Sequence, residues 1–501
     1  MMAGETKVKR IFTRREALKF GAIAGGSLLL PIALQHLSHA ATAGSPQPAR
    51  FQINLPIPPV LQPVRSDGTT DYYEIAMHKS QVEILPGLTT EIWAYNGITP
   101  GPTIKQNKDR QSVVRFINHL DIPTSIHLHG MASLPQYDGY PEDLIPPNYY
   151  KDYIYPNNRA ATLWYHDHAI HTTARNVYMG LAGMYIVQDR VERDLPLPKS
   201  NYDVPLIIQD KIFANNGSLI FDHDNHNGLM GDVILVNGVP WPRMEVANRK
   251  YRFRVLNASN SRAYKLALST GDDLIVIATD AGLMGAPVRT KDLRIGMAER
   301  YEFIIDFSRY PIGTQVVLQN LGLRNNKDYD GTGQIMRFDV VRAETDDSSI
   351  PSTLRTFQPL LESSAVRTRR WNFEHRNEMW VINGNTWDKN RVDANPAQGD
   401  IEIWNFINNA RDWFHPVHVH LVDFQILERN RQPPLPYERG WKDVVYLGED
   451  DNVRVIARFG PHQGKYIMHC HNIVHEDHDM MTQYQVGSGG IDPMSAPARP
   501  L

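Results

Sequence analysis

Ten of the 20 histidines lie in four short clusters, and each cluster contains two histidines separated by one residue. Residues two apart on a β-strand point to the same face, so each pair can present two imidazoles to one place. Eight imidazoles exceed the needs of one mononuclear centre, and three metal ions could share them. Chance explains one such pair but not four. The pairs are His127/His129, His166/His168, His418/His420 and His469/His471.

The single cysteine, Cys470, stands between His469 and His471, so it points to the opposite face of its strand. We therefore expect it to serve a second metal site, joined to the first through the backbone. The partners available on that face are His415, His475 and a sulfur of Met480 or Met481. Two histidines, a thiolate and a weak axial methionine describe a blue-copper electron-transfer site. Such a site would collect single electrons and pass them to the histidine cluster, which would deliver them to a multi-electron acceptor.

Strands must position these side chains. Short β-branched or aromatic runs bounded by Gly, Pro, Asn or Asp recur along the chain, and no long amphipathic helix is visible. Asn-Gly follows an apolar strand three times at nearly equal spacing, at Asn96, Asn237 and Asn383, and each time a strand ending in asparagine comes next. This internal repeat predicts an all-β chain of three Greek-key sandwiches, over residues 44–195, 196–350 and 351–501. The middle unit has no histidine at the corresponding place and is interpreted as a spacer.

Composition narrows the classes further. The chain has 501 residues, a formal net charge of -3 and no long basic run, so nucleic-acid binding has no support. One cysteine excludes an intrachain disulfide and a zinc site built on several cysteines.

Residues 1–43 resemble an export signal of the Tat type. Thr13-Arg14-Arg15 precedes an apolar stretch that is interrupted by Pro31 and is too short to span a bilayer. An uncleaved anchor is the alternative. We expect export through the Tat machinery to the periplasm or the medium, with no stable membrane anchor, as a monomer.

The four histidine segments and the three-unit layout resemble the multicopper oxidases, over essentially the whole chain after residue 43. Segments such as "KYRFRVLNASNSR", "GWKDVV" and "HEDHDMM" resemble the bacterial spore-coat laccase and bilirubin oxidase branch. The resemblance implies cupredoxin-like domains and four copper ions. It also implies four one-electron oxidations of a small-molecule reductant, coupled to reduction of O2 to two waters. The implied ligands are His415, Cys470, His475 and Met480 for type 1 copper, His127 and His418 for type 2, and His129, His166, His168, His420, His469 and His471 for the type 3 pair.

The resemblance also implies roles around the copper ligands. Asp138 and Glu476 match acidic positions that relay protons, although each could be an ordinary loop acid. Trp413, two residues before His415, could pack against that ligand or simply fill the core. Electrons would enter through an exposed edge of His475, rimmed by the Pro-rich segment 428–440.

Other functions stay open from sequence. The leading reductants are phenols, aromatic amines or tetrapyrroles such as bilirubin, and the alternative is a metallo-oxidase acting on Cu(I), Fe(II) or Mn(II). A pure electron carrier would not need the eight paired histidines, and copper-free structural relatives have lost ligands that are all present here. His223 and His226 are interpreted as solvated loop residues, with binding of a stray metal as the alternative. We interpret His171 and His478 as polar residues beside the clusters.

Overall fold

The computed structural model describes residues 44–410 and 413–501. The predicted export signal, 1–43, lies outside the described residues. Within the described ranges, no helix is long and apolar enough to cross a bilayer.

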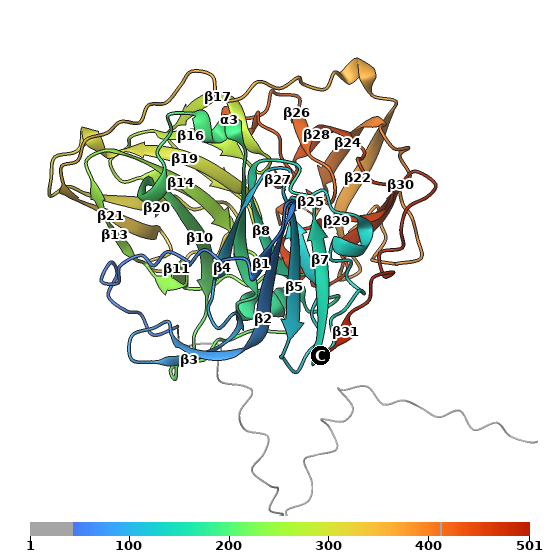
Figure 1. Cartoon of the computed structure of the whole chain (residues 1–501), viewed down its shortest axis with the longest axis horizontal. Helices are drawn as coiled ribbons and strands as arrows, with labels where there is room; N and C mark the ends of the chain where they lie inside the picture. The colour runs from blue at the N-terminus through green and yellow to red at the C-terminus, as the bar shows by residue number, and fades with distance from the viewer. Residues whose placement is uncertain (1–43, 411–412) are drawn as a thin grey trace, which may run out of the picture. The chain divides into compact units, whose positions relative to one another are not determined.

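In the part of the chain that the structure describes, six β-sheets, paired in chain order, make three sandwiches (Figure 1). The first sandwich, in blue to blue-green apart from the red β31, combines the sheet β1-β2-β5-β7-β31, with β3 on β2, and the sheet β4-β9-β8-β6. Its strands are β1 (Arg65–Ser66), β2 (Thr70–Glu83), β3 (Thr89–Tyr95), β4 (Gly101–Asn107), β5 (Gln111–Asn118), β6 (Ile126–His129), β7 (Tyr149–Tyr155), β8 (Ala161–Asp167), β9 (Ala182–Gln188) and β31 (Arg499–Pro500). The last strand of the chain therefore pairs with β7 of the first sandwich, far from its neighbours in sequence.

The middle sandwich, in green to yellow, combines the orders β12-β11-β10-β14-β19-β16-β17 and β13-β21-β20-β15-β18. Its strands are β10 (Asp203–Lys211), β11 (Val233–Val236), β12 (Val239–Pro240), β13 (Arg243–Ala247), β14 (Lys250–Asn257), β15 (Tyr264–Leu268), β16 (Leu274–Thr279), β17 (Gly282–Thr290), β18 (Leu293–Ile295), β19 (Arg300–Asp306), β20 (Gln315–Asn320) and β21 (Gln334–Arg342).

The third sandwich, in orange to red, combines β23-β22-β24-β28-β26 and β27-β25-β29-β30. Its strands are β22 (Arg367–Arg376), β23 (Met379–Ile382), β24 (Ile401–Asn408), β25 (His415–Val419), β26 (Phe424–Arg429), β27 (Val444–Leu447), β28 (Asn452–Arg458), β29 (Gly464–Cys470) and β30 (Met481–Val486). The helices are short: α2 (Thr173–Met179), α3 (Arg190–Asp194), α4 (Ile473–Asp477), and the 3-10 turns η1 (Pro135–Tyr137), η2 (Ser200–Tyr202), η3 (Phe307–Arg309), η4 (Glu362–Ser364) and η5 (Pro436–Glu438).

The repeat inferred from Asn-Gly is present in the backbone. Asn96, Asn237 and Asn383 have φ of 52°, 50° and 52°, and the glycine after each also has positive φ, as a tight hairpin turn requires. Each asparagine side chain accepts a hydrogen bond of 2.8 Å from a backbone N–H of a neighbouring strand, namely that of Ala76, Ile207 and Asn372. Each sandwich has a parallel strand pair at the corresponding place, β2 with β5, β10 with β14 and β22 with β24. In the first and middle sandwiches, β4 with β9 and β13 with β21 are parallel as well. The prediction of an all-β fold with three cupredoxin-like sandwiches is confirmed.

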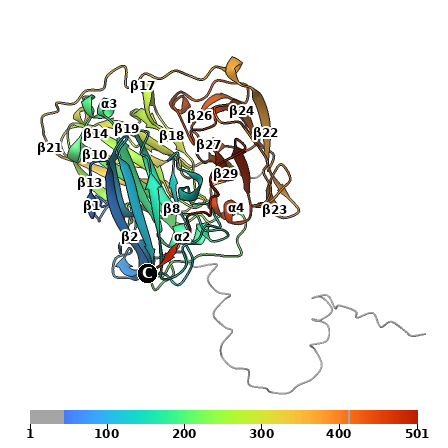
Figure 2. The same cartoon turned by 45° about the vertical axis from the view of Figure 1, so that its right-hand side comes forward.

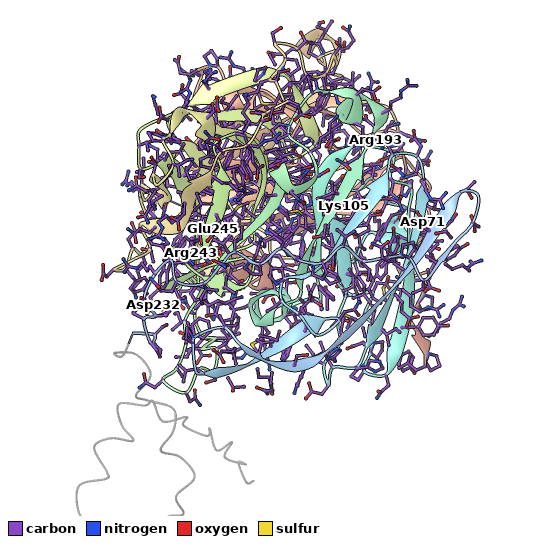
Figure 3. The ribbon with its side chains drawn as sticks, turned by 60° about the vertical axis from the view of Figure 1, so that its left-hand side comes forward. Asp71, Lys105, Arg193, Asp232, Arg243 and Glu245 are labelled. Atoms are coloured by element: carbon purple, nitrogen blue, oxygen red, sulfur yellow. The ribbon has the colours of Figure 1, made fainter. Side chains whose placement is uncertain are left out.

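The described chain begins with an arm that crosses the middle sandwich. The Ser45 backbone N–H donates to Asp232 at 2.7 Å, and the Leu55 N–H donates to the Arg243 carbonyl at 2.7 Å; Figure 3 labels Asp232 and Arg243 on this side. The arm and the strand β31 tie the sandwiches to one another, so residues 44–501 form one compact unit.

Candidate metal centre

Strand pairing between segments far apart in sequence brings the histidine clusters together. In the first sandwich, β6 pairs with β8 so that His127 lies opposite His166. In the third, β25 pairs with β29 so that His418 lies opposite His469. The two strand pairs face each other, since the rings of His127 and His418 lie 5.5 Å apart. The first and third sandwiches therefore share one buried cluster.

Two groups of imidazole nitrogens converge within this cluster. The Nε2 atoms of His127 and His418 are 3.3 Å apart. The Nε2 atom of His469 is 3.3 Å from that of His168 and 3.3 Å from that of His420. In four of these five rings the Nδ1–H donates away from the cluster. That of His127 donates to the Asp138 carbonyl (2.5 Å) and that of His420 to the Asp138 carboxylate (2.7 Å). That of His418 donates to the Asp443 carbonyl (2.8 Å) and that of His469 to the Cys470 carbonyl (3.1 Å). The Nε2 atoms of these rings are therefore unprotonated, and their lone pairs point toward one another. A shared cation stabilises this arrangement.

The remaining three imidazoles of the cluster also leave nitrogens without a partner. The His129 Nε2–H donates to Asp443 at 3.1 Å, which leaves its buried Nδ1 free. The His166 Nδ1–H donates to the Asp167 carbonyl at 2.8 Å, which leaves Nε2 free, and both nitrogens of His471 lack a hydrogen bond. The rings of His129 and His166 lie 5.1 Å and 5.3 Å from that of His471. Buried polar atoms rarely remain unpaired, so these nitrogens indicate ligands rather than packing.

The second site lies on the other face of β29. The Cys470 sulfur is 3.3 Å from Nδ1 of His415 and 3.8 Å from Nδ1 of His475, and the two nitrogens are 3.2 Å apart. Met480 packs in the same hydrophobic core as Cys470, whereas Met481 packs with Tyr140 and Ile467. Strand alternation thus separates the thiol from its flanking imidazoles.

Burial makes these side chains ready to bind a metal. It lowers the pKa of all ten clustered histidines below the usual value, to about 3 for His168 and His415 and about 4 for His418. Neutral imidazoles are metal ligands at physiological pH. Burial also raises the pKa of the Cys470 thiol, so a cation is needed to hold it as the thiolate. A soft thiolate with imidazoles and a thioether suits copper, and nitrogens 3.3 Å apart suit metal–nitrogen bonds of about 2.0–2.1 Å.

The two predicted acids both lie against imidazoles of the cluster. Asp138 accepts from His420 through its carboxylate and from His127 through its carbonyl. A Glu476 oxygen is 3.7 Å from Nδ1 of His168 and accepts from the Thr173 hydroxyl at 3.4 Å. Burial raises the pKa of both carboxyl groups well above the usual range. Carboxyl groups that retain a proton in this way can act as general acids and bases.

Sequence reasoning missed Asp443. Its carboxylate accepts from His129 at 3.1 Å, and its carbonyl accepts from His418 at 2.8 Å. Arg300, fully buried, donates two hydrogen bonds to the same carboxylate at 2.7 and 2.6 Å. The available signal was the "GWKDVV" segment that contains Asp443, but both partners of its carboxylate, His129 and Arg300, lie in other sandwiches.

One expectation around the second site is wrong. We expected an exposed edge on His475, but its side chain is fully buried, and its Nε2–H donates to the Asn227 carbonyl at 2.6 Å. Trp413 packs edge-on against the ligand His475, with ring centroids 5.3 Å apart, and against the hydrophobic core around Cys470. Trp380, which we did not single out, stacks on His475 at 3.8 Å. These contacts depend on a loop of the middle sandwich and on β23, which chain order does not reveal.

The segment 428–440 lies elsewhere than expected. Glu438 accepts hydrogen bonds from Arg294 of the middle sandwich at 2.9 Å and from Arg429 at 2.8 Å. The carbonyl that closes off His475 comes instead from Asn227 of the middle sandwich.

Three cupredoxin-like sandwiches with a shared imidazole cluster and an adjacent Cys-His-His site define a copper-dependent oxidoreductase. Sequence patterns described as multicopper oxidase match residues 76–192, 211–334 and 360–490. A bilirubin oxidase from Albifimbria verrucaria is 42% identical over 90% of this chain and 83% of its own length. A laccase from Bacillus stratosphericus is 35% identical over 86% of this chain and 98% of its own. The crystal structure of the McoA multicopper oxidase from Aquifex aeolicus superposes with a TM-score of 0.81, at 30% identity, over 88% of this chain and 100% of that one.

The chain belongs to the multicopper oxidase family. It is an oxidoreductase that binds copper and uses O2 and a reductant.

Proposed function

We propose that this enzyme couples one-electron oxidations of phenols, aromatic amines or tetrapyrroles of the bilirubin kind to the four-electron reduction of O2 to water. The observation that carries the proposal is the placement of Cys470 and His469 on opposite faces of one strand. One backbone then joins an electron-collecting site to a site that holds several metal ions.

The proposed complement is four copper ions. The type 1 ligands are His415, Cys470, His475 and Met480, and the type 2 ligands are His127 and His418. The free nitrogens divide the other six imidazoles into His168, His420 and His469 for one type 3 ion and His129, His166 and His471 for the other. When bound, copper supplies single-electron transfer and the binding and reduction of O2.

The residues around the ligands supply orientation and protons. Asp443 fixes which nitrogen of His129 faces the cluster, and backbone carbonyls do the same for His127 and His418. Asp138 and Glu476, both buried against the cluster, are proposed to deliver the protons that water formation requires.

Oxygen uptake by the copper-loaded protein tests the substrate class. Bilirubin, a phenol, an aromatic amine, Fe(II), Cu(I) and Mn(II) are compared in parallel. The proposal expects uptake with the organic reductants, and uptake with metal ions alone would refute it in favour of a metallo-oxidase. Cys470→Ser is the control for the site: it should lose the intense blue absorption, and its retention would overturn the type 1 assignment.

Export through the Tat pathway to the periplasm or the medium, and a monomeric state, are part of the same proposal. The export proposal rests on the twin arginines Arg14-Arg15 and the apolar stretch that follows them. Replacing both arginines with lysine should keep the protein in the cytoplasm, and unchanged export in cell fractionation would contradict this.

A further inference from the structure

A fully buried carboxylate of the middle sandwich, that of Asp280, contacts both members of the Arg300–Asp443 ion pair. Asp280 directly follows β16, and its side chain has no exposed surface. One oxygen accepts from the Arg300 backbone N–H at 2.8 Å. The other accepts from the backbone N–H groups of Asp443 at 3.3 Å and Val444 at 3.2 Å, where β27 of the third sandwich begins (Figure 2). Asp280 therefore fixes the backbone on both sides of the ion pair that lies against the imidazole cluster.

Lys442 adds a buried cation to this arrangement. Its ammonium group is 2.8 Å from the Asp280 carboxylate and 3.0 Å from that of Glu299, and it donates to the Tyr301 hydroxyl at 3.2 Å. Burial by itself lowers the pKa of Lys442, but the two carboxylates raise that pKa above its usual value, so the ammonium stays charged. Since Lys442 directly precedes Asp443, its ion pair with Asp280 holds the same piece of chain in place.

Asp443 transmits this placement to two imidazoles of the cluster. Its carboxylate accepts from the Nε2–H of His129 at 3.1 Å, and its carbonyl accepts from the Nδ1–H of His418 at 2.8 Å. These bonds leave Nδ1 of His129 and Nε2 of His418 as the nitrogens available to a metal. Hydrogen bonds of this kind set the tautomer and the orientation of a metal-binding imidazole, so a shift of Asp443 changes what both rings offer.

Charge balance for Lys442 would be a simpler role for Asp280. The other donors to its carboxylate argue for more, because they are three backbone N–H groups, those of Arg300, Asp443 and Val444. Balancing a charge requires only a nearby carboxylate, whereas three backbone hydrogen bonds fix where two strands lie relative to each other. The two roles predict different outcomes when both charges are removed together.

We propose that Asp280, paired with Lys442, positions Asp443 and thereby sets which nitrogens of His129 and His418 face the metal ions of the cluster. The middle sandwich, interpreted from sequence as a spacer, then supplies a positioning residue for the cluster that the first and third sandwiches share. The inference rests on the proposed four-copper complement. It concerns the cluster ions and leaves the type 1 site, on the other face of β29, unaffected.

Asp280→Asn tests the positioning, because asparagine keeps the shape of the side chain but loses its charge and one acceptor oxygen. Copper content and the intense blue absorption would be followed during dialysis against graded chelator concentrations. Loss of a partner that orients a metal-binding histidine costs about 10–100-fold in metal affinity. Asp280 acts through Asp443, so we expect the cluster copper to bind about tenfold more weakly, at the low end of that range. The blue absorption, which reports the type 1 ion, should persist to the same chelator concentration as in the parent.

Glu438→Gln is the matched control. Glu438 is equally buried and also joins the middle and third sandwiches, through ion pairs with Arg294 and Arg429. It should hold the cluster copper like the parent, even where its thermal midpoint falls.

A charge-balanced double variant separates positioning from stability, and it carries the test if Asp280→Asn alone does not fold. Asp280→Asn combined with Lys442→Met leaves no unpaired buried charge, so the thermal midpoint of the copper-free protein should return toward that of the parent. The cluster copper should still bind about tenfold more weakly, because the backbone hydrogen bonds are not restored.

Three results would overturn the inference. The first is a double variant in which copper affinity recovers together with the thermal midpoint. The second is an Asp280→Asn variant that holds the cluster copper within about twofold of the parent, and the third is equal loss of the blue and the cluster copper, which reports a general loosening of the fold. A parent protein that binds the blue copper alone would instead refute the proposed copper complement.

Discussion

Replacing Asp443 with asparagine tests whether one buried carboxylate holds both the imidazole cluster and the packing of the sandwiches. The carboxylate accepts from His129 of the first sandwich and from Arg300 of the middle one, while its own strand belongs to the third. Asparagine has nearly the same shape, so the change removes the negative charge and one acceptor oxygen. His129 loses the anion that fixes its orientation. Arg300 keeps its hydrogen bonds to backbone carbonyls, but its nearest remaining carboxylate oxygen, on Asp280, is 3.8 Å away.

The expected effects follow from these contacts. Removing a carboxylate that orients a metal-binding histidine typically costs 10–100-fold in metal affinity. Breaking a fully buried ion pair costs about 3–5 kcal/mol of folding free energy, because the remaining charge stays buried. At about 1 °C per kcal/mol for a unit of this size, the thermal midpoint should fall by about 3–5 °C.

Two measurements separate these effects. Copper retained after dialysis against graded chelator concentrations reports metal affinity, and thermal unfolding of the copper-free protein reports the fold. Asp152→Asn is the matched control, because its pair with Arg115 is partly exposed and is worth about 0–1 kcal/mol. The positioning role of Asp443 is refuted if Asp443→Asn has a copper affinity within twofold of the parent and the same thermal midpoint as the Asp152→Asn control.

Three further changes test the remaining arguments. Burial lowers the pKa of Lys211 to about 7 from 10.5, so the unfolded chain binds a proton between these values and the folded chain does not. Lys211 should therefore contribute a loss of stability as pH falls from 10.5 to 7, and Lys211→Met should remove that contribution from the pH dependence in urea titrations; an equal slope in both proteins would contradict the assignment. Asn237→Ala removes three hydrogen bonds from a hairpin turn, two of them buried, and should cost about 2–4 kcal/mol of unfolding free energy, so a loss below about 1 kcal/mol would show that the turn does not depend on them. Asp138→Asn should keep the blue absorption but slow oxygen reduction about 10²-fold, and unchanged turnover across pH would rule out proton relay by this residue.

Much of the site could be predicted because its signals are local. Two-residue alternation along a strand places His469 and His471 on one face and Cys470 on the other, whatever the rest of the chain does. The three Asn-Gly turns likewise need positive φ at adjacent residues, which makes them visible in sequence as a repeat.

Tertiary structure decided what lies around those ligands. Nothing near His129 in sequence indicates that its Nε2 is taken by Asp443, which leaves Nδ1 for the metal. Nor does the sequence around His475 reveal the Asn227 carbonyl that covers it. Both contacts join different sandwiches, and they form only when whole sheets pack together. Residue type and periodicity determined the ligands, whereas the packing of sheets distant in sequence determined which nitrogen each ligand offers and how the second site is closed to solvent.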